Sequence, residues 1–552
     1  MKPRLRTLPD FPPLSLLLPP AKPTPAASEA AWARDLRLDD LVSAFAPEPR
    51  YANFIRQTLT ALNADPDVIA WRQAVLSDLL DNPALTQTVE QLLPRFADLR
   101  QGRALFGQRQ RPPLLETADR LAELDLFINT AQTLYEALKR ATLRATALTT
   151  LRDQLARLIA DPNFIALREE LPALQRPLQK LASLTIGVNL DAQLQPSAAV
   201  LLSINEQPFN EPRSLLSKLI GQRADSSDES PIAPLHSLPE ERQYRLLSPL
   251  FQDLERILRD VVQPVARALG KYVRISAAPL AALEQELAFY LSAVRLVQLL
   301  RQRGIALTQP QVAPIEARLT HIEDLVNLHL ILKQPHCVPV PNEVHLDDQG
   351  RIAILTGPNS GGKTTYLQAV GLAYVLFQAG LPIAARRAQL SPVDAIFTHF
   401  PAPETQQQGR LAEEASRLRY ICLQATAYSL VLMNESLSST VASEATYLAQ
   451  DVLCGLRAIG VRAIYATHLI DLPMRIPEMH DTAQGESKLF SLVAGVHLNA
   501  DGEAQPTFRI ERGMPLGRGY AREIARRHGI SLEQILAARA DRQASSPRSA
   551  AD

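Results

Sequence analysis

A glycine-rich loop that directly follows an apolar run is the part of this 552-residue sequence with the clearest chemistry. The apolar run 351–356 predicts a buried strand, and residues 357–365 read Gly-Pro-Asn-Ser-Gly-Gly-Lys-Thr-Thr. Glycines let backbone N–H groups turn inward around phosphate oxygens, a geometry that side chains would obstruct. A helix beginning near Thr364 would direct its positive end at the same anion. The pattern therefore predicts a nucleoside triphosphate site rather than a chance glycine turn.

Two side chains of this loop carry the expected chemistry. Lys363 would place its ammonium group on the β- and γ-phosphates, and Thr364 would place its hydroxyl group on Mg²⁺. ATP and Mg²⁺ are therefore the expected ligands. The residues predicted to surround the phosphates are Gly357, Pro358, Asn359, Ser360, Gly361, Gly362, Lys363, Thr364 and Thr365.

The loop resembles that of the ABC-type ATPases, and its doubled glycine before the lysine resembles the MutS family. Residues 428–435 form an apolar run ending in Asn-Glu, which resembles the family's Walker B strand, and residues 463–468 form another run ending in Thr-His. The resemblance implies that Glu435 polarises the attacking water and that His468 senses the γ-phosphate, so both join Lys363 as expected catalytic residues. It also places Asn342 at the nucleotide site.

The residues alone leave other interpretations open. The segment 432–435 could be a buried strand that meets a solvent turn, and His468 could be a structural histidine at a strand end. Two positions also depart from the family's pattern. Asn434 stands where the family has an aspartate, so Thr364 and Asn434 would hold Mg²⁺ without a negative charge, which leaves the hydrolysis rate open. At the second, Gly409 and Arg410 stand where a family serine reaches the partner subunit's site, and Arg410 could supply a cation there.

The chain is expected to be multi-domain, with a mainly α-helical core and lever domain followed by an α/β ABC-type P-loop ATPase domain. Leu/Ala-rich segments interrupted at prolines predict the helices, and alternating apolar spacings of four and three over 281–300 predict a long lever helix. The expected parts are a proline-rich leader at 1–30, which could wrap the body or be disordered, the helical domain at 31–334 with a strand-containing insertion near 185–212, the ATPase domain at 335–540 and a polar tail at 541–552.

Composition restricts the class of protein. The 58 basic and 58 acidic residues balance, so no overall charge draws the chain to nucleic acid. Three widely spaced cysteines, Cys337, Cys422 and Cys454, predict core thiols in a reducing compartment. The uncharged stretch 367–385 continues the phosphate loop, so we expect a helix, a glycine turn and a buried strand rather than a membrane span. A cytoplasmic protein without a membrane partner is predicted.

The resemblance implies an ATP hydrolase that dimerises through its nucleotide sites and binds DNA in repair or recombination. The residues themselves support DNA binding only weakly, because two clusters of arginine residues could equally form solvent-exposed faces. These groups are Arg295, Arg301 and Arg303, and Arg518, Arg522, Arg526 and Arg527. Helical sequence begins soon after the leader, so we expect no mismatch-reading domain; residues 209–211 fit its Phe-x-Glu motif in letters only. Little sequence follows Ala540, so we expect no nuclease tail.

Two alternatives come from other classes of protein. The first is a nucleotide-gated scaffold dimer with weak or no hydrolysis, which Asn434 and Gly409 favour and Glu435 and His468 oppose. The second is a transporter ATPase, which is disfavoured because no LSGGQ-type signature lies between the two nucleotide motifs. Phosphate release measured with and without DNA would separate the first alternative from an ATP hydrolase.

Overall fold

The computed structural model describes most of the chain as two compact units. The described residues are 14–23, 31–46, 48–106, 113–179, 183–194, 196–207, 263–272, 275–334, 337–401, 410–498, 504–515, 526 and 529–544. Unit 1 comprises 1–14, 87–141 and 148–284, and unit 2 comprises 15–86, 142–147 and 285–552. The Phe-x-Glu match at 209–211, Gly409, Arg518, Arg522 and Arg527 lie outside the described residues.

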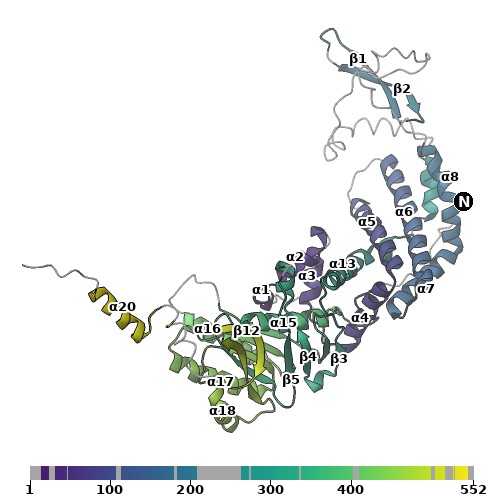
Figure 1. Cartoon of the computed structure of the whole chain (residues 1–552). Coiled ribbons are helices and arrows are strands. Elements are labelled where there is room, and N and C mark those ends of the chain that lie inside the picture. Colours follow the sequence, from purple (N-terminus) through teal and green to yellow (C-terminus); the bar gives the residue numbers. More distant parts are fainter. Residues whose placement is uncertain are drawn as a thin grey trace, which may run out of the picture. The chain divides into compact units, whose positions relative to one another are not determined.

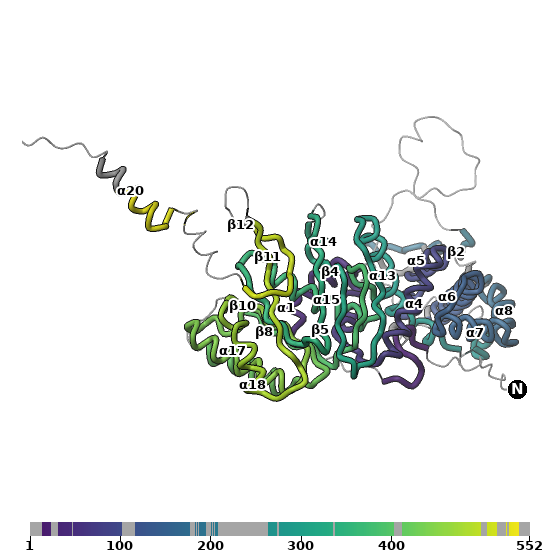
Figure 2. The backbone as a smooth tube through the Cα atoms, turned by 60° about the horizontal axis from the view of Figure 1, so that its bottom comes forward, coloured from purple at the N-terminus to yellow at the C-terminus, as the bar shows by residue number. Residues whose placement is uncertain are grey.

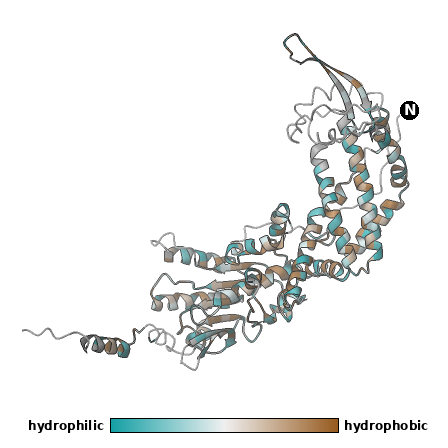
Figure 3. Ribbon diagram, turned by 45° about the horizontal axis from the view of Figure 1, so that its top comes forward, coloured by the Kyte–Doolittle hydropathy of each residue, from teal (hydrophilic) through white to brown (hydrophobic). Residues whose placement is uncertain are grey.

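Unit 1 is built from long helices and one hairpin. Its elements include α6 (Pro113–Arg140), α8 (Pro162–Gln179), α12 (Ala278–Ala281), η1 (Gly270–Tyr272), β1 (Ser183–Leu190) and β2 (Pro196–Asn205), together with most of α5 (Pro83–Phe106) and α7 (Thr146–Ala160). The rings of Phe127 and Phe164 meet edge to face between α6 and α8. β1 and β2 pair antiparallel, in the segment where strands were predicted. Hydrophobic and hydrophilic residues share each long helix in Figure 3, as expected of helices with one buried side.

Prolines set the starts of several helices. α4 (Pro66–Asp81), α5 and α8 begin at Pro66, Pro83 and Pro162, where the missing N–H costs nothing and the fixed φ suits the first turn. Asp65 caps α4 by accepting a hydrogen bond from the N–H of Asp67. The predicted lever helix is α13 (Leu283–Gln302), which has residues in both units. The residues of its predicted seam, Leu283, Leu287, Tyr290, Val294 and Val297, are all buried.

Unit 2 contains a six-stranded sheet that carries the glycine-rich loop (Figure 1). The strand order is β12 (Ala504–Arg512), β11 (Leu489–Leu498), β6 (Ile352–Thr356), β10 (Arg462–Thr467), β9 (Leu430–Asn434) and β8 (Ile396–His399). All neighbours are parallel except β11 and β12, which run beside each other in yellow-green in Figure 2. The central strands β6, β9 and β10 are buried along their whole length, which is typical of parallel strands covered on both faces.

Helices cover both faces of this sheet. On one face, Gly371 of α15 (Lys363–Gln378) lies against Leu432 of β9. On the other, Ile352 and Met433 belong to a cluster with residues of α16 (Arg410–Gln424), α17 (Ala442–Ile459) and α18 (Ile476–Thr482). A second sheet has the order β3 (Gln311–Val312), β7 (Arg387–Leu390), β4 (Thr320–Leu325) and β5 (Asn342–Leu346). The other helices of unit 2 are α1 (Trp32–Asp35), α2 (Leu38–Phe45), α3 (Pro49–Thr60), η2 (Ile315–Ala317), α14 (Leu328–Lys333), η3 (Pro473–Arg475) and α20 (Leu532–Ala544).

The fold agrees with the predicted class at a coarse level, as a multi-domain chain of helices and mixed sheets. The compact units divide within α5, α7 and α13, whereas the predicted functional boundary at 334/335 stays a prediction. The uncharged stretch 367–385 forms the rest of α15 and a turn at Gly380, but the next strand, β7, begins only at Arg387. Among the described residues, no helix combines the length and the hydropathy that a bilayer span requires.

Two expectations about particular residues need correction or refinement. Cys337 is exposed and Cys422 and Cys454 are half-buried, so the prediction of core thiols is wrong for Cys337, which lies outside regular structure. Within the predicted leader, the structure describes 14–23, and residues 15–17 are firmly held. The Ser15 hydroxyl donates to Glu286 of α13, and the Leu17 carbonyl accepts from the guanidinium of Arg72.

Candidate nucleotide site

The glycine-rich loop joins the end of β6 to the start of α15, as predicted. Gly357 and Gly362 have φ values of 143° and 88°, in a region of backbone conformation that residues other than glycine rarely adopt. A Cβ atom on Gly357 would also lie 2.6 Å from the Cβ of Ala494 on β11. Asn359 and Ser360 at the tip of the loop are exposed. The loop therefore has the backbone geometry and the open tip that a phosphate cradle requires.

Lys363, the first residue of α15, forms hydrogen bonds with the backbone of the glycine-rich loop. Only 3% of its surface is exposed, and its ammonium group donates hydrogen bonds to the carbonyls of Gly357 at 2.8 Å and Pro358 at 2.9 Å. Burial lowers the pKa of Lys363, while the negative charge of Glu435 acts in the opposite direction. An anion in the loop would supply the countercharge that this buried ammonium group lacks among its two neutral acceptors.

The two predicted metal-binding residues lie in contact. The hydroxyl of Thr364, in the first turn of α15, donates a hydrogen bond of 3.1 Å to the amide oxygen of Asn434. Asn434 is the last residue of β9 and is 5% exposed. Because β9 and β6 both flank β10 in parallel, their carboxyl ends meet at one edge of the sheet, which brings these oxygens together. Both oxygens are hard donors of the kind that suit Mg²⁺.

The residue predicted to activate water and the residue predicted to sense the γ-phosphate also form a pair. One carboxylate oxygen of Glu435, directly after β9, lies 2.7 Å from Nε2 of His468, directly after β10. Both side chains are partly open to solvent, at 31% and 39% exposure. Glu435 has φ = 51°, and its N–H donates to the carbonyl of Ala466 at 2.8 Å. The carboxylate is thus held by a neighbouring strand end while remaining accessible.

Asn342 is the first residue of β5 and forms hydrogen bonds with the backbone of β12. Its side-chain amide donates to the carbonyls of Val340 and Phe508 and accepts from the N–H of Ile510. These bonds fix the start of β5 to β12. The oxygen and nitrogen of this amide already form hydrogen bonds with backbone groups. Its contact with a nucleotide stays a prediction.

Phe508 is a site residue that the sequence did not reveal. Its ring lies 3.5 Å from the position that a Cβ atom on Gly362 would take, and the residue is 48% exposed with φ = 57°. An exposed aromatic side chain on a strained backbone beside a phosphate loop offers a flat surface for a nucleotide base. No local signal could have found it, because β12 reaches the loop only through its pairing with β11.

Other predicted residues lie elsewhere or are committed to other contacts. Arg303 donates to the carbonyl of Ile331 and so joins α13 to α14. Arg410 begins α16. Arg526 is exposed. The described part of the chain holds no group of three or more His, Cys, Asp or Glu side chains arranged to bind a metal.

Comparison with known proteins gives matches over both halves of the chain. The MutS2 N-terminal domain model matches residues 64–303, and the MutS domain V model matches residues 353–511. The protein called Endonuclease MutS2 from Thermomicrobium roseum is 35% identical over 297 residues, which are 52% of this chain and 35% of that protein. Endonuclease MutS2 from Thermus thermophilus is 34% identical over 203 residues, 36% of this chain and 26% of that protein.

A relative with another name matches over a similar length. DNA mismatch repair protein MutS from Thermotoga neapolitana is 31% identical over 196 residues, which are 35% of this chain and 24% of that protein. The chain therefore spans only about a quarter to a third of the length of these curated relatives.

Proposed function

This chain belongs to the MutS family, and we propose that it is a Mg²⁺-dependent ATP hydrolase that works as a homodimer on DNA. One observation carries the hydrolase proposal. Lys363, the Thr364–Asn434 pair and the Glu435–His468 pair converge at the carboxyl ends of three neighbouring parallel strands. Ligands of open α/β sheets bind at this edge.

Each residue then has a role that its contacts support. The ammonium of Lys363 and the loop N–H groups hold the phosphates, replacing the two carbonyl acceptors that Lys363 now has. Thr364 and Asn434 supply neutral oxygens to Mg²⁺, which when bound neutralises phosphate charge. Glu435 orients and deprotonates water. His468 senses the γ-phosphate and holds the Glu435 carboxylate by a hydrogen bond. Phe508 offers its ring to the base.

DNA and the dimer are proposed from kinship rather than from contacts. Relatives are named as endonuclease and mismatch repair proteins, which supports a role in DNA repair or recombination. Because the matches cover about a third or less of those proteins, nuclease activity is not proposed for this chain. The scaffold alternative keeps support from Asn434, which gives the metal no negative charge.

Phosphate release from Mg²⁺-ATP tests the hydrolase proposal. We expect turnover by the purified chain and its loss, together with ATP binding, in Lys363→Ala. The exposed Lys488 on the same unit offers a matched control, and Lys488→Ala should retain both properties. ATP binding without phosphate release would favour the scaffold dimer, and unchanged ATP affinity in a folded Lys363→Ala variant would reject the site.

A salt series with homoduplex, mismatched and branched DNA tests the partner. Affinity should fall steeply with salt because phosphate contacts dominate binding. We expect less than about tenfold preference for a single mismatch over a perfect duplex, or roughly 1.4 kcal/mol. A larger preference at physiological salt would reveal a mismatch reader in this chain.

A further inference from the structure

The turn that follows β9 has an unusual backbone. Glu435 and Leu437 both lie in the left-handed region, with φ values of 51° and 65°. Neither residue is a glycine or an asparagine, so this conformation persists only where the surroundings impose it. Ser436 lies between them and is 5% exposed. A buried turn with two unfavourable residues must be held by specific contacts.

Five hydrogen bonds from three elements hold this turn, and in the longest of them the Ser436 hydroxyl donates to the carbonyl of His399 at 3.4 Å. The Ser436 hydroxyl lies 2.7 Å from Nδ1 of His399, the last residue of β8. The Ser436 carbonyl accepts from the hydroxyl of Tyr465 on β10 at 2.9 Å. The Leu437 N–H donates to the carboxylate of Glu414 on α16 at 2.8 Å, and the Glu435 N–H donates to Ala466.

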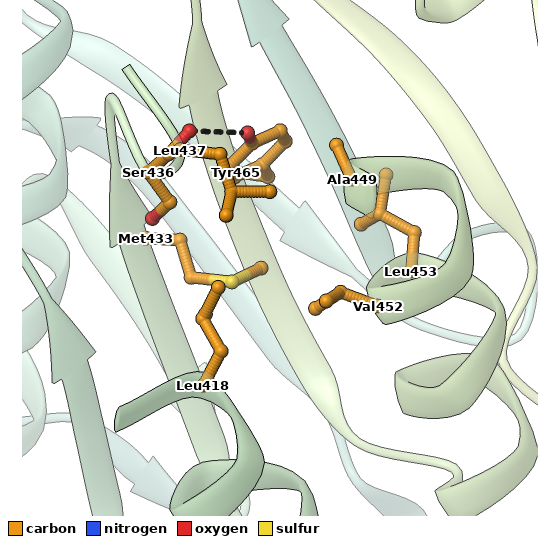
Figure 4. Close-up of a pocket in the computed structure, with 8 residues that line it drawn as sticks. All are labelled: Leu418, Met433, Ser436, Leu437, Ala449, Val452, Leu453 and Tyr465. Atoms are coloured by element: carbon orange, nitrogen blue, oxygen red, sulfur yellow. Dashed lines mark hydrogen bonds between the residues drawn. The ribbon is translucent and has the colours of Figure 1, made fainter. Parts of the chain in front are cut away.

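The surroundings of Ser436 and Tyr465 are a packed core rather than a ligand pocket (Figure 4). Leu418, Met433, Leu437, Leu453 and other apolar side chains line this region and leave essentially no room for a water molecule. The network therefore has no ligand of its own. Its polar groups converge on one peptide segment, the segment that carries Glu435.

His399 is suited to hold Ser436 as a neutral group. It is 1% exposed. Burial lowers the pKa of His399 to about 4, and the positive charge of Arg417 acts in the same direction. Arg417 on α16 donates to the carbonyl of Phe400, next to His399, while the carboxylate of Glu414 already accepts from Leu437. A neutral imidazole keeps one donor and one acceptor, which suits a hydroxyl partner.

We propose that His399 and Ser436 are positioning residues for Glu435, holding its backbone so that its carboxylate faces the site of water attack. The carboxylate itself has His468 as its side-chain partner. If the backbone of Glu435 relaxed into the extended region, its Cβ would point elsewhere, and the carboxylate would leave the strand edge. The inference rests on the proposed ATP hydrolysis and concerns the rate of the chemical step, not nucleotide binding.

The first test is the split between kcat and nucleotide affinity in single variants. Ser436→Ala and His399→Leu should each lower kcat by about tenfold or more, with the Kd for ATP changed less than about twofold, as expected of groups that act only on the chemical step. His399→Asn, whose amide can occupy the place of Nδ1, should restore much of the activity. Ser438→Ala removes a hydroxyl from an exposed position of the same loop and should have no effect.

The second test combines Ser436→Ala with Glu435→Gln and measures single-turnover hydrolysis. If Ser436 acts through the Glu435 carboxylate, Ser436→Ala should lower the hydrolysis rate little further once that carboxylate has been removed. The effects of residues that act as a unit are non-additive. Equal fold-losses in both backgrounds would overturn the inference. Thermal unfolding checks each variant, and if His399→Leu does not fold, Ser436→Ala and His399→Asn carry the test.

The two proposals fail in different ways. Phosphate release by the parent protein with unchanged kcat in Ser436→Ala and His399→Leu would overturn the positioning role alone. An equal rise in the Kd for ATP and fall in kcat would also overturn it, since the residues would then support the loop in general. No phosphate release by the parent would overturn the hydrolase proposal and the positioning role with it.

Discussion

Replacing Asn434 with aspartate should tighten Mg²⁺ binding at the nucleotide site. The amide oxygen of Asn434 already accepts a hydrogen bond from Thr364 at 3.1 Å, and a carboxylate oxygen of aspartate could accept the same bond in nearly the same volume. The substitution therefore adds one negative charge beside the expected metal without removing a contact. We predict that Asn434→Asp lowers the Mg²⁺ concentration required for half-maximal phosphate release.

The magnitude follows from two opposing contributions. Two unit charges about 4 Å apart attract by roughly 4 kcal/mol at an effective dielectric constant of 20, and a divalent ion doubles this. Desolvating a carboxylate at a position only 5% exposed costs several kcal/mol in return. A net gain of about 1–2 kcal/mol remains, which corresponds to a roughly tenfold lower Mg²⁺ requirement. Without metal, the same buried charge should lower the melting temperature.

Mg²⁺ titration of phosphate release, with thermal unfolding in the presence and absence of Mg²⁺-ATP, measures both effects. Asn53→Asp, which adds the same charge at an exposed position of α3, is the matched control and should change neither. An unchanged or higher Mg²⁺ requirement in Asn434→Asp would refute the reasoning. It would mean that the metal site is built around an amide, and the scaffold alternative would gain support.

Three further predictions address water activation, packing and pH. Glu435→Gln should keep the Kd for ATP within a few-fold and slow hydrolysis by about 10²-fold or more, so that ATP is trapped; a parental rate would assign water activation to another residue. Gly380→Ala should lower the free energy of unfolding in urea by about 2–4 kcal/mol, because Gly380 has φ = 79° and an added Cβ would lie 2.2 Å from the Cβ of Arg72; Gly270→Ala, with no neighbour within 4 Å, should have much less effect. His399 has its pKa lowered from 6.5 to about 4, chiefly by burial. The unfolded chain therefore takes up a proton as the pH falls below 6.5 and the folded protein does not, so stability is lost from pH 6.5 down to pH 4, by roughly 3 kcal/mol in total. This part of the pH dependence should be missing in His399→Leu, and an identical pH profile would contradict it.

The parts of the site that the sequence predicted are those with local signals. Gly357 and Gly362 are separated from Lys363 by fixed short spacings, and these spacings reflect backbone geometry within one strand, loop and helix. Glu435 and His468 each follow an apolar run, and parallel strands place such ends at one edge of a sheet. Residue type and strand position were therefore enough to expect both residues at one site, although their hydrogen bond with each other was not predicted.

The remaining features depend on contacts between distant segments. Phe508 lies beside Gly362 only because β12 pairs with β11, and the sequence of β12 contains no spacing that encodes this register. His399 and Ser436 are ordinary strand-end and turn residues until β8 and β9 become neighbours. The hydrogen-bonding groups of Asn342 join β5 to β12, and the predicted contact of its side chain with the nucleotide stays a prediction. The residue type indicated that Asn342 forms polar contacts, but it did not indicate which backbone groups these contacts involve.

The helix that begins with Lys363 shows how such distant contacts support the site. At its far end, the guanidinium of Arg72 donates to the carbonyl of Gln378 and to that of Leu17. Arg72 is buried, and desolvation lowers its pKa, while the negative charge of Glu286 opposes that shift. A cation at the carboxyl end of a helix is stabilised by the helix dipole, as an anion is at the amino end. The buried arginine and the phosphate loop thus occupy complementary ends of α15, and residues 15–17 of the leader join this helix to α13 through Arg72 and Glu286.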